Sequence, residues 1–240
     1  MKKLLFTLIV LAVSLSSIQA QNWWKNRITG EGDVVKRTLD VDDFDGFTLA
    51  VSGDVYLRQG SKTELVVKAQ ENIIDNIDLK MDGSHLKITY DRPVWKSKGI
   101  DIYITVPSLN KIGVSGSGDI QADEKFSNLG DLQVAVSGSG NVKFECDAKD
   151  VETRVSGSGN ISIKGKGTSF SSRVSGSGNV RASDFEVADA KISVSGSGNV
   201  YVFATESLEA SVSGSGDVKY KGKPRVKAKS SGSGNIAAIR

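Results

Sequence analysis

Hydrophobic and polar residues alternate along the C-terminal half of the chain. Around Ser137 one parity holds Leu132, Val134, Val136, Gly138, Gly140, Val142 and Phe144, and the other holds Gln133, Ala135, Ser137, Ser139, Asn141 and Lys143. A period of two is typical of an extended chain with one buried face. The pattern therefore predicts two β-strands joined by a glycine-rich bend, with the glycines on the inward parity and the serines on the outward parity.

The bend belongs to a six-residue phrase, Ser-Gly-Ser-Gly-Asn/Asp-Val/Ile, that occurs seven times at steps of 22, 19, 19, 20, 18 and 18 residues. Its defining residues are Ser115, Gly116, Gly118; Ser137, Gly138, Gly140, Asn141; Ser156, Gly157, Gly159, Asn160; Ser175, Gly176, Gly178, Asn179; Ser195, Gly196, Gly198, Asn199; Ser213, Gly214, Gly216; and Ser231, Gly232, Gly234, Asn235. Units of this length match the coils of a β-solenoid, each of which buries its apolar face against the next. We predict an all-β parallel β-helix, or β-solenoid, with coils of 18–22 residues. The general preference of parallel crossovers favours a right-handed one.

The glycines would lie where each coil turns a corner with no room for a side chain inside. Stacking the coils would then place serine over serine and asparagine over asparagine. We expect hydrogen-bonded polar ladders along the outside of this corner.

Residues 28–110 are less regular. Two degenerate copies of the phrase occur at Ile28–Val34 and Val51–Val55, and the 63 residues from Ser52 to Ser115 equal about three coils. Strands are predicted at 65–69, 77–81, 86–90 and 100–106, with a hairpin at Asp82-Gly83 and a helical turn within 71–77. We expect a single solenoid domain over 28–240, divided into an irregular all-β part with some antiparallel pairing (28–110) and regular repeats (111–240).

The first residues have the features of a secretory signal peptide. Lys2 and Lys3 precede an apolar run from Leu4 to Val13, which is too short to span a bilayer, and cleavage after Ala20 is expected. A retained membrane anchor is the alternative. Residues 21–27 form a lead that includes Trp23 and Trp24, which either cap the first coil or contact a partner.

Charge and composition exclude several functions. Removing residues 1–20 lowers the net charge from +3 to +1, so nothing global indicates nucleic-acid binding. Cys146 is the only cysteine and His85 the only histidine, which excludes an intrachain disulfide and disfavours a His/Cys zinc site or a catalytic triad. We expect a buried Cys146, a surface His85 and no cofactor.

Phosphate binding, calcium binding and action on a polysaccharide are three further interpretations of the repeat region. Phosphate binding is disfavoured because the phrase lacks the Lys-Ser/Thr ending of a phosphate-binding loop. A calcium site would need several carboxylates, yet Asp119 and Asp217 are the only acidic residues at the fifth position of the seven copies. A polysaccharide-acting enzyme would need paired acids, and the candidates in the return loops are Asp123, Glu124, Asp131, Asp147, Asp150, Asp184 and Asp189.

Several short motifs occur in a fixed order along most of the chain: Phe44-Asp45-Gly46-Phe47, Val51-Ser52-Gly53-Asp54-Val55, Gln59-Gly60, Ile104-Thr105-Val106-Pro107 and the serial Val-Ser-Gly-Ser-Gly-Asn-Val phrases. By these motifs roughly residues 28–240 resemble a known bacterial family, the auto-transporter adhesin head GIN domain. The resemblance implies a secreted β-helical protein, and it supplies no catalytic residues.

The last coil is rich in lysine. Lys219, Lys221, Lys227 and Lys229 fall on the outward parity, where they either keep another chain from pairing with the edge strand or contact an anionic partner. We expect an exported, non-enzymatic binding or adhesion module in the periplasm, at the outer surface or outside the cell. Its partner would be a surface glycan or protein, it would have no transmembrane segment after signal removal, and a homo-oligomer is open. The polysaccharide-acting enzyme is the alternative.

Overall fold

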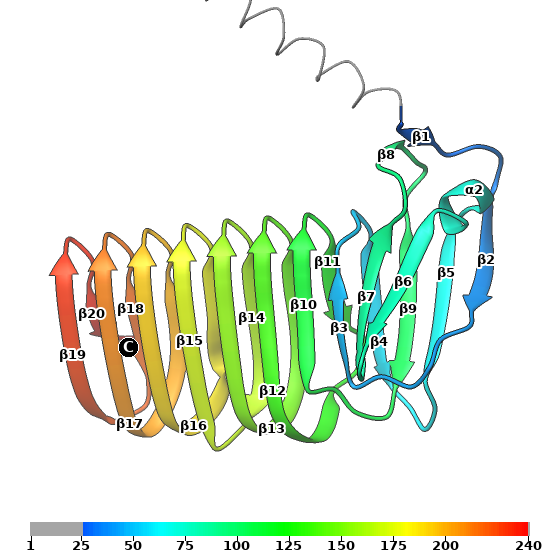
Figure 1. Cartoon of the computed structure of the whole chain (residues 1–240). Coiled ribbons are helices and arrows are strands. Elements are labelled where there is room, and N and C mark those ends of the chain that lie inside the picture. Colours follow the sequence, from blue (N-terminus) through cyan, green and yellow to red (C-terminus); the bar gives the residue numbers. More distant parts are fainter. Residues whose placement is uncertain (1–25, 240) are drawn as a thin grey trace, which may run out of the picture.

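The alternation of apolar and polar residues produces a stack of parallel β-coils. The computed structural model describes residues 26–239, so the expected signal peptide, Trp23 and Trp24 lie outside the described residues. The chain forms a β-solenoid of about seven turns, with mixed β-structure at its N-terminal end (Figure 1). The predicted fold class is confirmed.

The repeat region consists of long, bent strands. They are β10 (Lys111–Gly116), β11 (Asp119–Ala122), β12 (Phe126–Gly138), β13 (Asn141–Gly157), β14 (Asn160–Lys166), β15 (Ser169–Gly176), β16 (Asn179–Gly196), β17 (Val200–Gly214), β18 (Val218–Lys221), β19 (Arg225–Gly232) and β20 (Ile236–Ala238). Every pairing among them is parallel, and equivalent positions of the phrase lie in register: Ser137 pairs with Ser156, Ser156 with Ser175, and Ser175 with Ser195. The predicted stacking of one phrase over the next is therefore correct.

The inward parity fills the interior of the coils. Val136, Phe144 and Val155 are each 1% exposed, and the rings of Phe126 and Phe144 lie 4.9 Å apart. Burying a side chain of this size contributes about 1.5–3 kcal/mol. Since each coil supplies several such residues, the hydrophobic interior holds the stack together.

The N-terminal part has shorter strands. They are β1 (Ile28–Thr29), β2 (Val34–Leu39), β3 (Gly46–Leu49), β4 (Asp54–Gln59), β5 (Glu64–Gln70), β6 (Ile77–Asp82), β7 (His85–Tyr90), β8 (Val94–Lys96) and β9 (Asp101–Val106), with one helical turn, α2 (Glu71–Ile74). β6 and β7 form the predicted antiparallel hairpin around Asp82-Gly83, and α2 confirms the predicted helical turn.

The order of the coils differs from the prediction in one place. β3 and β4 form a coil that pairs directly with β10 and β11, so no coil lies between Ser52 and Ser115. The intervening chain passes to the other side of β3 and β4, where β7 and β9 pair with them as the outer coil. The expectation of about three coils in this interval was wrong, because parity does not specify which side a coil stacks on.

The first degenerate copy of the phrase is also not a solenoid corner. Ile28 and Thr29 of β1 pair with β8, and β2 pairs antiparallel with β5, which is antiparallel to β9. β2 and β5 thus add two strands to one side of the stack rather than a further coil.

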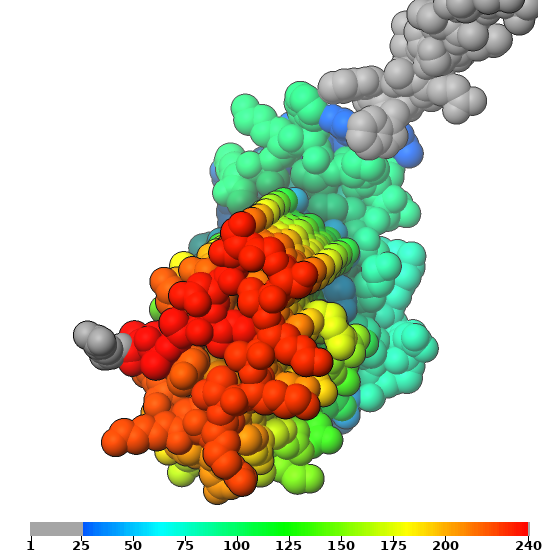
Figure 2. Space-filling view, turned by 90° about the vertical axis from the view of Figure 1, so that its left-hand side faces the viewer, coloured from blue at the N-terminus to red at the C-terminus, as the bar shows by residue number. Residues whose placement is uncertain are grey.

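Within residues 26–239 the stack has two open ends. One row of strands runs from β6 through β7 and β3 to β19, and the other runs from β2 through β5 and β9 to β20. β2 and β6 therefore end the rows at the N-terminal end, and β19 and β20 end them at the C-terminal end. The last coil is exposed on its inward parity as well, with Val226 41% exposed, and Figure 2 looks onto this end.

Candidate functional site

The seven corners are joined to one another by a repeated backbone hydrogen-bond pattern. The carbonyl oxygen of Gly138 accepts two bonds from the next coil, from the N–H groups of Ser158 and Gly159, each 2.9 Å long. In each later coil the N–H groups of the second serine and the second glycine of the phrase bond in the same way to the carbonyl oxygen of the first glycine in the preceding coil. Because every corner repeats this contact, the corners form one straight, rigid edge.

Close stacking explains the two glycines. Gly157 has a φ of 139°, which side chains rarely adopt, and a β-carbon placed on it would lie 2.5 Å from the carbonyl oxygen of Gly138. A β-carbon on Gly159 would overlap both the carbonyl oxygen of Gly140 and the side chain of Val136. The obstacle is mainly the preceding coil, a more specific cause than the predicted lack of room inside the corner.

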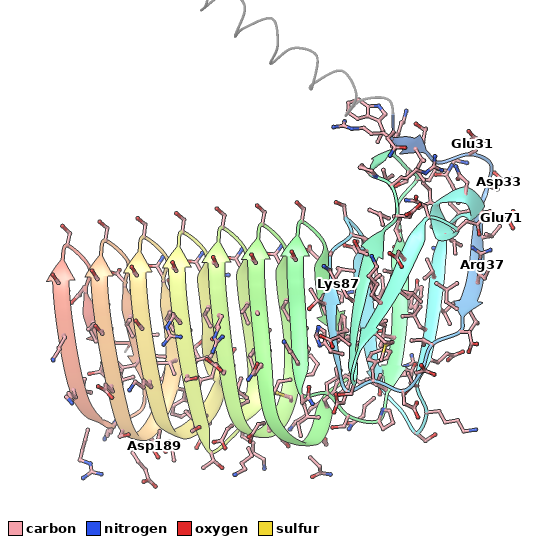
Figure 3. All side chains as sticks on the ribbon, in the orientation of Figure 1. Glu31, Asp33, Arg37, Glu71, Lys87 and Asp189 are labelled. Atoms are coloured by element: carbon pink, nitrogen blue, oxygen red, sulfur yellow. The ribbon has the colours of Figure 1, made fainter. Side chains whose placement is uncertain are left out.

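The serines of the phrase lie on the outside of the corner, as predicted. Both serines are exposed in every copy, for example Ser137 and Ser139. Figure 3 shows a row of side chains that project from successive turns at this edge. Within residues 26–239 no hydrogen bond joins these serine side chains from coil to coil, so the expected serine ladder exists in register but not as hydrogen bonds.

The asparagines form the expected hydrogen-bonded ladder. The side-chain nitrogen of Asn160 donates to the side-chain oxygen of Asn141 at 2.9 Å, and Asn179 donates to Asn160 at 3.0 Å. Asn199 donates in the same way to Asn179 at 2.9 Å. The backbone N–H of Asn199 reaches the same oxygen, so each asparagine holds two coils in register beside the serine edge.

Aspartates stand near both ends of this ladder. Asp119 accepts from the backbone and side-chain nitrogens of Asn141, and it pairs in register with Asp54. The backbone N–H of Asp217 donates to the side-chain oxygen of Asn199, and the carboxylate of Asp217 accepts a hydrogen bond from the backbone N–H of Asn235. Among residues 26–239 no group of three or more His, Cys, Asp or Glu side chains is arranged to hold a metal ion.

Most acids proposed for an enzyme have basic or hydroxyl partners. Asp147 pairs with Lys125 at 2.8 Å and Asp184 pairs with Lys221 at 3.1 Å. The hydroxyl of Ser169 donates to Asp150 at 2.6 Å, and Ser207 donates to Asp189. Of the candidates, Asp131 and Asp150 alone are paired in register on neighbouring coils.

Two other singled-out residues have structural surroundings. Cys146 is buried as predicted, and burial raises the pKa of its thiol to about 12, which makes it unreactive at neutral pH. His85 is half-buried rather than a simple surface residue. Its ring nitrogen Nε2 lies 2.9 Å from the hydroxyl oxygen of Thr48, within hydrogen-bond distance. Burial first, and then Lys111, lower the pKa of His85.

The lysines of the last coil engage the coils before them. Lys219 lies over the ring of Tyr201 at 5.8 Å, Lys221 bonds to Asp184, and Lys227 lies 3.7 Å from Glu209. A hydrogen bond from Lys191, with a further contribution from Lys227, lowers the pKa of Glu209.

Sequence reasoning missed an aromatic residue and a charge cluster. Trp95 in β8 is 60% exposed, and the guanidinium of Arg27 lies 4.9 Å from the centre of its ring. Acidic residues from segments far apart in the sequence also gather at the N-terminal end. The sequence shows these residues, but their proximity depends on the pairing of β2 and β5 and on the β6–β7 hairpin.

The hollows on the described surface are shallow and lie away from the serine edge. One of about 310 Å³ is lined by residues that include Asp43, Phe44 and Pro107. Another of about 260 Å³ is lined by Asp40, Val41, Asp42, Leu79 and Met81. No described helix has the length and apolar character needed to cross a membrane.

Solved structures share this architecture. A "putative adhesin" from Bacteroides fragilis matches with a TM-score of 0.84 at 27% identity, over 88% of this chain and 100% of that one. A "putative lipid binding protein" from Parabacteroides distasonis matches with a TM-score of 0.73 at 26% identity, over 89% of this chain and 100% of that one. A "putative adhesin" from Parabacteroides merdae, at 20% identity and a TM-score of 0.70, covers 90% and 100% and shares the fold.

No curated protein matches the chain. The family model described as "Putative auto-transporter adhesin, head GIN domain" matches residues 43–224, which include the coil of β3 and β4, the outer coil of β7 and β9, and six of the seven phrases. The neighbours from Bacteroides fragilis and Parabacteroides merdae carry adhesin names and share the fold. By the extent of this match, the chain belongs to the auto-transporter adhesin head GIN domain family.

Proposed function

We propose that the protein is an exported, non-enzymatic adhesion module that binds an extended surface glycan or protein along its serine edge. Family membership and the adhesin name of the Bacteroides fragilis neighbour support an adhesion-type role. The observation that carries the proposal is the straight edge of exposed serines, one pair per coil, held by the hydrogen-bonded corners and the asparagine ladder.

The chemistry of this edge suits a polar, extended partner. Each hydroxyl both donates and accepts a hydrogen bond, and strand spacing places successive corners about 4.8 Å apart. A rigid row of this kind loses little entropy on binding, because its side chains are short and its backbone is already fixed. The partner would be contacted by many weak bonds rather than enclosed in a pocket.

A binding screen tests the proposal. The purified chain is applied to arrays of bacterial and host glycans and of surface proteins, beside a variant in which four corner serines are changed to alanine: Ser139, Ser158, Ser177 and Ser197. Since each lost hydrogen bond contributes about 0.5–1.5 kcal/mol, we expect more than a tenfold loss of affinity for the partner.

The matched control changes four outward serines on the flat sheets to alanine: Ser162, Ser171, Ser193 and Ser211. It should retain the parent's affinity. Equal losses in both variants, or none in the corner variant, would reject the serine edge as the binding surface. Cleavage of a bound glycan that is abolished by Asp150→Asn would instead support the enzyme alternative, because Asp131 and Asp150 are neighbouring carboxylates.

A further inference from the structure

The C-terminal end of the rod is strongly basic. The last coil, residues 217–239, contains six basic residues and one acidic residue, a net charge of +5: Lys219, Lys221, Lys223, Arg225, Lys227 and Lys229 against Asp217. β19 is exposed along its whole length, and its outward positions carry three of these cations. The cationic row therefore borders a strand edge that no other strand of the described chain pairs with.

The N-terminal end is strongly acidic. Its outermost elements, β2, α2, β6 and the segments that flank them, span residues 29–45 and 71–82. These segments hold ten acidic and three basic residues, a net charge of −7: Glu31, Asp33, Asp40, Asp42, Asp43, Asp45, Glu71, Asp75, Asp78 and Asp82 against Lys36, Arg37 and Lys80. Figure 3 places Glu31, Asp33 and Glu71 together at this end.

The two ends also complement each other strand by strand. β6 and β19 end one row of strands, while β2 and β20 end the other. If a second copy continued the stack, β19 would meet the β6 of that copy, and β20 would meet its β2. Unpaired N–H and C=O groups on such edges readily add another strand.

Opposite charges meet at two of the three outward positions where β19 would face β6. β19 runs antiparallel to β6, since β6 is antiparallel to β7 and the strands from β7 to β19 are parallel. In the register that sets Arg225 opposite Asp82, Lys229 faces Asp78 and Lys227 faces Lys80. β20 has no charged residue, which suits β2, where Lys36 and Arg37 lie.

Among residues 26–239, apolar groups at both ends are left uncovered. Val226 is 41% exposed and Ile239 is 37% exposed at the C-terminal end, and Val34 and Val35 are 38% and 40% exposed at the other. The N-terminal end also has the hollow that Asp40 and Asp42 line together with the apolar side chains of Val41, Leu79 and Met81. Both surfaces combine charge with apolar area, as protein interfaces do.

From these observations we infer that the rod associates head to tail with a second copy of this chain, the basic last coil of one copy against the acidic N-terminal end of the next. This contact is heterologous and does not close, so it extends into longer rods. Tail-to-tail pairing is disfavoured because it would set like charges directly opposite one another. The acidic opposite end gives the last-coil cations a role beyond edge protection or recognition of a foreign anion.

A charge-swap experiment tests this contact. The first variant, Arg225→Glu with Lys229→Glu, makes the outward row of β19 acidic and leaves the Lys227–Glu209 pair intact. The second, Asp78→Lys with Asp82→Lys, makes the outward row of β6 basic. The control, Lys143→Glu with Lys164→Glu, applies the first variant's charge change in the middle of the rod, at exposed positions.

Sedimentation velocity is measured at about 0.01 M and about 1 M salt, where the Debye lengths are roughly 30 Å and 3 Å. We expect the parent and the control to form rods at low salt that dissociate at high salt. Each end variant alone should associate at least tenfold more weakly. An equimolar mixture of the two end variants should restore association, because the acidic β19 row of one copy then meets the basic β6 row of the other.

Three outcomes would overturn the inference. The mixture could fail to associate better than its components. The first variant could associate more strongly than the parent, which is the result that edge protection predicts. Edge protection predicts the same increase for a triple variant in which serine replaces Lys221, Lys227 and Lys229. The parent could also stay monomeric at low salt while binding vesicles that contain anionic lipid, or an acidic glycan, through the same cations.

Discussion

The backbone N–H of Ser177 donates a 2.9 Å hydrogen bond to the carbonyl oxygen of Gly157, one coil earlier. A β-carbon on Gly176 would lie 2.5 Å from that same oxygen. Serine and glycine thus have separate duties in the corner: the serine backbone makes the bond, and the glycine leaves space for it.

We predict that Gly176→Ala strongly lowers the free energy of unfolding, by about 3 kcal/mol or more, and that Gly176→Val and Gly196→Val do so as well. The cost combines a positive φ, about 1–3 kcal/mol, with overlap against the preceding coil. Ser177→Ala and Ser197→Ala should cost much less. Urea unfolding compares them, and equal losses for serine and glycine changes would contradict the assigned roles.

Gly116 provides a matched control for the overlap. It has the same conformation, with a φ of 145°, but no atom lies within 4 Å of its β-carbon position. The coil before it has a corner two residues shorter, at Val51–Val55, so less chain lies there. Gly116→Ala should therefore cost only the backbone strain, about 1–3 kcal/mol, and less than Gly176→Ala.

The asparagine ladder predicts opposite effects for two reciprocal substitutions. Asn179→Asp removes the donor that bonds to Asn160 and places an acceptor against an acceptor, which should destabilise by about 1–3 kcal/mol at neutral pH. Asp217→Asn supplies a donor opposite the side-chain oxygen of Asn199 and should stabilise by about 0.5–1.5 kcal/mol. Thermal unfolding of both variants checks the pair of signs, and a ladder without energetic weight would leave both melting temperatures unchanged.

His85 should make stability sensitive to mild acid. Its pKa in the folded state is lowered from 6.5 by burial and by Lys111, while Asp82 and Asp45 oppose the shift. The unfolded chain thus binds the proton first as the pH falls, and stability should decline from about pH 6.5 down to the folded pKa. His85→Gln should reduce this decline in pH-dependent urea unfolding. A parent with a flat profile between about pH 7.5 and 5 would argue against it.

Calcium should not be required for folding. The ladder beside the corner consists mostly of neutral asparagines, whereas a hard divalent ion prefers several carboxylates. Adding a chelator to the purified protein should leave its melting temperature in place, and adding calcium should not raise it. A large downward shift with the chelator would restore the calcium interpretation of the repeat.

Local features of this fold were predictable, and the global order of its coils was not. The parity around Ser137, the hairpin at Asp82-Gly83 and the turn at Glu71 depend on residues close together in the sequence. The stacking of β10 directly on β3 does not, because the alternation in Val51–Val55 is satisfied whichever coil lies beside it. A periodic pattern specifies which face is buried, but not which neighbour buries it.

The candidate surfaces divide in the same way. The seven copies of the phrase identified the serine edge, since register repeats the local pattern at every coil. The acidic N-terminal end could not be recognised, because Asp42 and Asp82 are 40 residues apart and reach the same end of the rod only through the hairpin and the strand order. Trp95 was missed for a similar reason: its exposure depends on the short pairing of β1 with β8.

Each corner contact links a coil only to its immediate neighbours. The length of the rod can therefore change only by whole coils. Removing residues 157–175, which make up one step of 19, would set Gly176 over Gly138 with the same bonds that Gly157 makes now. Coils can thus be gained or lost one at a time by duplication or deletion of gene segments without redesign of the rest. Related proteins are then expected to differ by whole coils. Selection would act on the length of the rod and leave its cross-section unchanged.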